Sequence, residues 1–139
     1  MAEKRQRKPY SVFISHSHQD RWIAKQWVRL IEETNKKGVR TFLDEKDIEG
    51  GDSIAEKIRE GIRQCNELVV LLTPSSVRRE WVVVEMSVAW GLKKRIVAIL
   101  HHVSPKQMPD MSYAYKAIDL NDFEQYLDQL RKRAKEQIT

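Results

Sequence analysis

The sequence predicts an α/β domain built around a five-stranded, mostly parallel sheet. Two observations point to this fold class: short apolar runs alternate with amphipathic segments along the chain, and the links between them are short. Strands and helices that alternate in this way form parallel sheets with right-handed crossovers. We expect the flavodoxin-like, three-layer form with strand order 2-1-3-4-5. The 139 residues fit one domain, at residues 10–139, and we expect residues 1–9 to form a basic, flexible tail.

The first strand is expected at Tyr10–Ser15, a short run with an apolar centre. Ser17-x-x-Asp20 predicts a capping box at the start of the first helix, where apolar residues then recur at helical spacing. A second strand is expected at Val39–Leu43. The acidic segment Asp44–Asp52 follows, and its polar side chains predict a loop.

The middle of the chain repeats this pattern. Ser53-x-x-Glu56 predicts a second capping box, and Leu68–Leu72 reads as a strand covered on both faces of a parallel sheet. Valines in the segment Trp81–Trp90 favour a strand by composition. Its length and the alternation already under way favour a helix, which we expect Gly91 to close.

The last third is expected to contain a strand at Ile96–Leu100, a loop at Ser104–Pro109, a short strand at Ala117–Leu120 and a terminal helix. In open sheets of this kind, ligands bind beyond the carboxyl ends of the strands. The loops expected at that edge are residues 15–18, 44–52, 73–80 and 101–109.

Composition excludes several classes of protein. No apolar stretch approaches the roughly 20 residues of a membrane span, so we expect no membrane insertion. The net charge of +5 comes from basic runs near the two ends that lack interleaved aromatic residues, so we expect no nucleic-acid partner. A single cysteine, Cys65, suits a reducing cytoplasm and is expected in the core. Glycine-rich phosphate loops are absent from the sequence.

Histidine and tryptophan are two further residue types that can bind ligands. The histidine pairs His16/His18 and His101/His102 belong to strands that another strand is expected to separate, so we predict polar loop residues and no metal site. Three of the four tryptophans lie at helical spacing and are expected to pack in the core: Trp22, Trp27 and Trp90.

Glu85 is the only charged residue in the run Trp81–Trp90. Carboxylates are almost never fully buried unless they are paired or serve chemistry. Trp81 lies four residues earlier, on the same face of a helix. The alternative is an ion pair on a partly exposed helix face with Arg78, Arg79 or Lys93.

These residues together resemble the TIR (Toll/interleukin-1 receptor) domain family. Residues 10–16 (YSVFISH) resemble its first box, and residues 38–51 resemble its second box and BB loop. Trp81 and Glu85 match its W-x-x-x-E segment, which carries the catalytic glutamate in NAD-cleaving TIR domains. Gly50 stands where receptor and adaptor TIR domains usually have proline, so the chain resembles bacterial TIR proteins more than Toll receptors.

The resemblance implies an NAD+ nucleosidase that cleaves the nicotinamide–ribose bond and gives nicotinamide with linear, cyclic or conjugated ADP-ribose, in bacterial antiphage defence. Glu85 would be the catalytic residue, and NAD+ would be the substrate, with no cofactor. Homo-oligomerisation with other TIR domains would activate it, and a downstream effector would sense the product. The implied substrate-binding residues are Trp81, Ser15, His16, Ser17, Asp44, Ile48, Glu49, Gly50 and Gly51.

Two alternatives remain open at the level of sequence. The first is a non-catalytic TIR scaffold that mediates TIR–TIR interaction and signalling, with the BB loop as its contact surface. The second is a glycosyltransferase that processes nucleosides on a related fold. Base exchange on nucleosides without a diphosphate would separate the second from an NAD+ nucleosidase.

Overall fold

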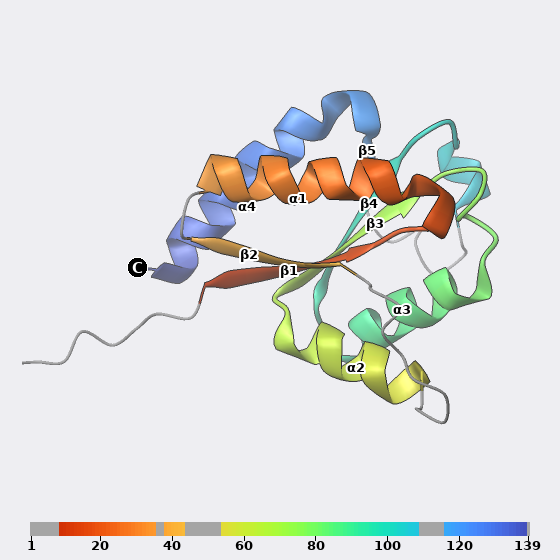
Figure 1. Ribbon diagram of the computed structural model, residues 1–139, viewed down its shortest axis with the longest axis horizontal. Helices are drawn as coiled ribbons and strands as arrows, with labels where there is room; N and C mark the ends of the chain where they lie inside the picture. The colour runs from red at the N-terminus through yellow and green to blue at the C-terminus, as the bar shows by residue number, and fades with distance from the viewer. Residues whose placement is uncertain (1–8, 36–37, 44–53, 109–115, 139) are drawn as a thin grey trace, which may run out of the picture.

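The computed structural model describes residues 9–35, 38–43, 54–108 and 116–138 (Figure 1). Within these ranges strands and helices alternate as the sequence predicts. The strands are β1 (Tyr10–Ser15), β2 (Val39–Leu43), β3 (Glu67–Leu72), β4 (Arg95–Leu100) and β5 (Ile118–Asp119). The α-helices are α1 (Arg21–Asn35), α2 (Ile54–Gln64), α3 (Glu80–Gly91) and α4 (Phe123–Ile138), and short 3-10 turns are η1 (His18–Asp20), η2 (Pro105–Gln107) and η4 (Leu120–Asp122).

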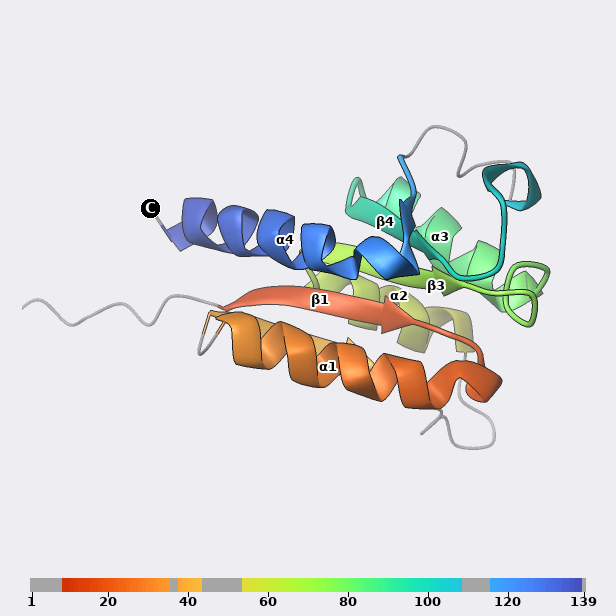
Figure 2. The same ribbon diagram turned by 90° about the horizontal axis from the view of Figure 1, so that it is seen from above.

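The five strands form one parallel sheet in the order β2-β1-β3-β4-β5, which confirms the predicted fold class. Helices α1 and α4 cover one face and α2 and α3 the other, and α1 and α4 run along the strands (Figures 1 and 2). The connection from β1 leads outward to β2, whereas the connection from β3 leads the opposite way to β4. The carboxyl ends of β1 and β3 therefore form the topological switch point of the sheet.

Alternating side chains of the central strands fill two separate cores. Val69 and Leu71 of β3 pack in the core under α1 and α4, whereas Leu68, Val70 and Leu72 pack in the core under α2 and α3. This alternation follows from the two-residue period of a strand. Every residue of β3 is buried, as predicted for a strand that is covered on both faces.

Several details of the elements differ from the prediction. β5 has two residues where four were expected, and it pairs with β4 only at Ile99 and Leu100. Gly91 is the last residue of α3, but it does not close the helix: Leu92 is the C-cap, and Lys93 has the positive φ of 58°. Lys93 therefore adopts the left-handed backbone conformation that glycine was expected to supply.

The packing prediction for the tryptophans was wrong for two of them. Trp27 is buried and stacks on Phe123 at a centroid distance of 4.9 Å. Trp22 is 72% exposed and Trp90 is 63% exposed. Both lie on the outer faces of their helices, because helical spacing alone does not decide which face meets the sheet.

The predicted capping box at Ser17 was also wrong. Ser17 precedes the 3-10 turn η1, and its side chain makes no capping hydrogen bond to the backbone. Its hydroxyl donates instead to the Asp20 carboxylate at 2.6 Å. The second predicted box, which begins at Ser53, lies outside the described residues, as do residues 1–8 and the predicted loop Asp44–Asp52.

None of the helices in the described part of the chain combines the length and apolar composition that a bilayer span requires. Cys65 is buried, as expected, and burial raises the pKa of its thiol to about 12. A thiol with so high a pKa carries almost no thiolate at neutral pH, so Cys65 is a core residue and not a nucleophile.

Candidate active site

The residues at the carboxyl end of β1 are buried. Ser15, His16 and Ser17 are all buried, and Ser15 pairs in register with Val70 of β3. The Nδ1 atom of His16 lies 2.8 Å from the carbonyl oxygen of Ser17. These three predicted substrate-binding residues are therefore buried at the switch point, at the carboxyl end of β1.

A cluster of hydroxyl groups surrounds Asp20 at this edge of the sheet. Its Oδ2 atom accepts hydrogen bonds from Ser17 Oγ at 2.6 Å, Thr73 Oγ1 at 2.6 Å and Ser75 Oγ at 3.1 Å. We call these four residues the Asp20 cluster. Ser17 follows β1 and Thr73 follows β3, so the cluster spans the switch point. Thr73 and Ser75 belong to the loop at residues 73–80 that was expected at this edge, whereas their hydrogen bonds to Asp20 were not predicted.

The loop from β3 to α3 is braced by its own hydrogen bonds. Ser76 Oγ donates to the carbonyl of Leu71 at 2.7 Å and accepts from the Thr73 N–H at 2.8 Å. The Thr73 carbonyl accepts from the backbone N–H groups of Ser76 and Val77. The loop continues to Arg79, the N-cap residue of α3. The end of β3 is thus tied to the start of α3 through a compact turn.

Helix α3 carries the two residues of the W-x-x-x-E segment. Trp81 is half-buried in its first turn, and Glu85 is fully buried one turn later. Glu85 lies on the buried face of α3 that also contains Val82, Met86 and Ala89. The expectation of a partly exposed helix face, which accompanied the ion-pair alternative, is therefore wrong, because Glu85 is 0% exposed.

Residues Asp44, Ile48, Glu49, Gly50 and Gly51, which were predicted to bind substrate, lie outside the described residues. The described part of the candidate site therefore consists of the buried residues Ser15–Ser17, the Asp20 cluster and α3 with Trp81 and Glu85. Both loops of the Asp20 cluster lie at the same end of the molecule in two perpendicular views (Figures 1 and 2).

A second buried carboxylate, Glu67, lies at the opposite end of the sheet. Its oxygens accept hydrogen bonds from Tyr10 at 2.6 Å, Tyr126 at 2.7 Å, and Arg133 Nε and Nη2 at 2.9 and 3.1 Å. We call these four residues the Glu67 cluster. It joins β1, β3 and α4 at the amino ends of the strands, away from the switch point. This cluster was not predicted from the sequence.

The Glu67 cluster shifts the ionisation of its neighbours. Burial, reinforced by the charge and hydrogen bonds of Glu67, raises the pKa of Tyr10 and of Tyr126. Burial alone would lower the pKa of Arg133, but the hydrogen bonds and charge of Glu67 outweigh burial and raise it. The phenols therefore stay neutral hydrogen-bond donors, and the guanidinium stays charged. The Glu67 carboxylate is thus fully engaged in hydrogen bonds within the fold.

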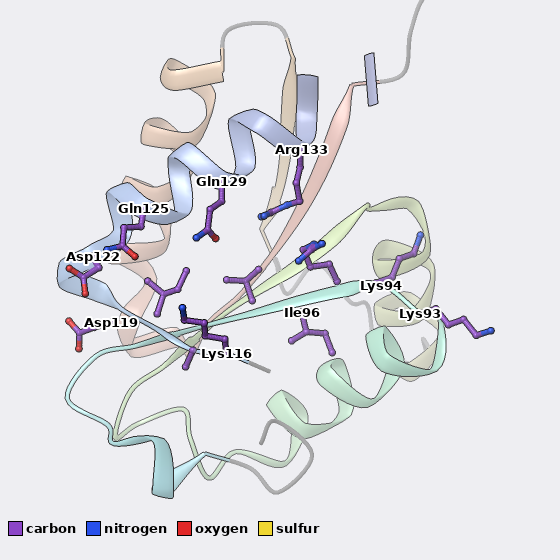
Figure 3. A pocket seen from close by; sticks show the side chains of 13 residues that line it. Lys93, Lys94, Ile96, Lys116, Asp119, Asp122, Gln125, Gln129 and Arg133 are labelled. Atoms are coloured by element: carbon purple, nitrogen blue, oxygen red, sulfur yellow. The ribbon is translucent and has the colours of Figure 1, made fainter. Parts of the chain in front are cut away.

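An open groove of about 720 Å³ lies between α4 and the β4–β5 edge of the sheet (Figure 3). Gln129 and Arg133 point into it from α4, and Ile96 lines it from β4. Neither Glu85 nor the Asp20 cluster is among its lining residues. Its charged lining residues are Lys93, Lys94, Arg95, Lys116, Arg133, Asp119 and Asp122. The groove is thus mainly basic and separate from the candidate active site.

Comparison with known proteins agrees with this fold. The family model of the TIR domain matches residues 12–132. The chain belongs to the TIR domain family. The solved TIR domain of the Toll-related receptor TRR-2 from Hydra magnipapillata superposes with a TM-score of 0.68 at 22% identity, covering 94% of this chain and 99% of that one. This similarity shows the shared fold.

Two curated relatives of this TIR domain have names that describe NAD+ chemistry. The chain is 29% identical over 110 residues to the NAD(+) hydrolase TcpC of Escherichia coli, and 31% identical over 108 residues to the 2′ cyclic ADP-D-ribose synthase AbTIR of Acinetobacter baumannii. The matches cover 75% and 74% of this chain but only 35% and 39% of those proteins. The chain therefore spans little more than a third of the length of either relative.

Proposed function

We propose that this TIR domain is an NAD+ glycohydrolase or cyclase that cleaves the bond between nicotinamide and ribose. The observation that carries the proposal is the full burial of Glu85, one turn after Trp81 on the helix that follows the switch point. The names of TcpC and AbTIR support NAD+ as the substrate.

The chemistry of this bond suits a single carboxylate. The nicotinamide leaving group of NAD+ is already cationic, so no general acid is needed to expel it. Positive charge instead develops on the ribose as the bond breaks, as in glycoside hydrolysis. Glu85 would stabilise that charge, and an interaction that strengthens in the transition state raises turnover and not only binding.

Hydrolysis of this bond needs water as its only other reactant. The C–N bond between ribose and nicotinamide breaks with its electron pair on the ring nitrogen, which leaves neutral nicotinamide. Water then forms a C–O bond to the ribose and releases a proton, which gives ADP-ribose. A hydroxyl of the same molecule would take the place of water in a cyclisation. Trp81, half-buried in the first turn of α3, would line the pocket for the departing ring.

The test is to incubate concentrated, purified protein with NAD+ and to follow products by chromatography with mass spectrometry. We expect release of one nicotinamide for each NAD+ consumed, with a mass that identifies linear or cyclic ADP-ribose. The assay needs a high protein concentration, because we propose that association with a second TIR domain activates the enzyme. Intact NAD+ over the whole range of protein concentration would contradict the proposal.

A second candidate function, a TIR scaffold, is favoured by the basic groove between β4, β5 and α4 (Figure 3). An open, charged groove far from the candidate active site suits association with another protein surface. We propose that this groove contributes to association between TIR domains.

Charge reversal in the groove tests this association. Lys116→Glu should weaken self-association roughly tenfold at low salt, because it replaces a cation that lines the groove with an anion. Sedimentation velocity over a concentration series measures the change. Lys25→Glu, on the exposed face of α1, is the matched control with the same change in net charge. Equal association of the two variants would rule the groove out as a contact surface.

A further inference from the structure

We propose that Asp20 is a positioning residue for the reaction: its carboxylate joins the loop after β1 to the loop after β3 and so fixes the start of α3. The inference rests on the proposed function, since it concerns the placement of Trp81 and Glu85 for NAD+ cleavage. Asp20 itself is not assigned a contact with substrate.

A single carboxylate oxygen gathers donors from two loops that are distant in the sequence. Ser17 lies three residues before Asp20, whereas Thr73 and Ser75 lie 53 and 55 residues after it. Two of the three O···O distances are 2.6 Å, typical of strong hydrogen bonds to an ionised carboxylate. The pair of loops is thus held by charge-assisted bonds across the switch point and not by apolar packing alone.

Without the carboxylate, the three hydroxyl groups would keep only their contacts with one another and the longer contact of Thr73 with Ser76. Ser75 Oγ lies 3.1 Å from Ser17 Oγ and 2.9 Å from Thr73 Oγ1, so three hydroxyl hydrogens serve five close contacts. The Asp20 carboxylate is the only acceptor among these four side chains that has no hydrogen of its own to place. Removing its charge should therefore let the two loops separate or rearrange.

Movement of Thr73 would be transmitted to α3. Thr73 is bonded through its backbone to Ser76 and Val77, and the turn ends at the N-cap Arg79. Glu85 follows one and a half turns later on the same helix. A displacement of about 1 Å at a catalytic group can cost roughly a hundredfold in rate. The connection from Asp20 to Glu85 thus runs through the Asp20–Thr73 hydrogen bond, the turn at residues 73–77 and the first turns of α3.

Kinetics separate positioning from simple stabilisation. We would measure kcat and KM for NAD+ with wild type, Asp20→Asn, Asp20→Ala and Ser75→Ala, at a temperature where all are folded by circular dichroism. We expect Asp20→Ala to lower kcat by about 30- to 100-fold while KM changes less than about threefold, with a smaller loss for Asp20→Asn and Ser75→Ala. Tyr10→Phe, in the Glu67 cluster at the other end of the sheet, is the destabilised control and should keep its kcat.

Hydrogen exchange provides a readout that does not depend on turnover. Amides of residues 73–79 and of the first turn of α3 should exchange faster in Asp20→Ala than in wild type, whereas β3 amides should not change. A kcat for Asp20→Ala within about twofold of wild type, or unchanged exchange at residues 73–79, would overturn the inference. If wild type itself leaves NAD+ intact, the proposed function fails, and the exchange data alone decide whether Asp20 joins the two loops.

Discussion

Replacing Glu85 by glutamine is expected to lower the rate of NAD+ cleavage by about 10²- to 10³-fold, because it removes the charge that opposes the positive charge on the ribose. Glutamine has nearly the same size and shape as glutamate, so the buried face of α3 remains filled. Glu85→Ala should lose at least as much activity. Product formation at saturating NAD+, followed by chromatography, measures both variants.

The control for this prediction is Glu80, the other carboxylate of α3. Glu80 precedes Trp81 directly, is exposed, and lies outside the W-x-x-x-E register. Glu80→Gln should therefore keep its activity within about twofold, since a solvated charge one turn away contributes little to a buried site. Thermal unfolding distinguishes the roles of Glu85: a catalytic carboxylate predicts lost activity with a midpoint within a few degrees of wild type. Turnover retained in Glu85→Gln would refute the assignment.

The fold was predictable because its main signal is local and repeated. The β3 segment alternates between two cores one residue at a time, and helices on both faces leave it no polar positions from Leu68 to Leu72. Such a run of leucine and valine identifies a central parallel strand from the sequence alone. The strand order then follows from the common doubly wound connection rules.

Burial within helices was harder to predict, because spacing does not reveal which face is covered. Trp27 is buried, where Phe123 stacks on it, whereas Trp22 and Trp90 are exposed. That contact depends on α4, about a hundred residues further along the chain. Information of this kind is tertiary and absent from a local pattern.

The candidate site was predictable in part for the same reason. Glu85 stood out because one charge interrupts an apolar run, and its full burial agrees with that signal. Asp20 was predicted to be part of a local helix cap. Its partners Thr73 and Ser75 lie in the loop after β3, which a local pattern around Asp20 does not reveal. A hydroxyl-rich segment that follows a buried strand, Thr73–Ser76, was the available signal.

Glu67→Ala is expected to destabilise the fold by about 3–5 kcal/mol, because it leaves buried partners of a carboxylate without an acceptor. Tyr10 and Tyr126 would lose their acceptor inside the protein, and Arg133, whose side chain is only 18% exposed, would lose its bidentate partner. The thermal midpoint should fall by roughly 10 °C or more in a chain of this size. Differential scanning calorimetry and urea unfolding measure the change.

An exposed ion pair provides the comparison. Glu60 lies 3.7 Å from Arg63, and both side chains are more than half exposed. Glu60→Ala should cost no more than about 0.5 kcal/mol, since solvent screens such pairs. Equal losses in Glu67→Ala and Glu60→Ala would show that the Glu67 cluster contributes nothing beyond ordinary surface electrostatics.

Alkaline pH should expose the same cluster in the unmodified protein. Because burial and Glu67 raise the folded-state pKa of Tyr10 and Tyr126 above the ordinary value of about 10, their contribution is complete below that pH. As the pH rises above about 10, the phenols of the unfolded chain lose their protons first. The free energy of unfolding therefore falls with pH until the pH reaches the folded-state pKa. Tyr10→Phe removes one of the two phenols, so its free energy of unfolding should fall less steeply with pH above about 10. Parallel curves for wild type and Tyr10→Phe would mean that burial and Glu67 do not raise the pKa of Tyr10 in the folded protein.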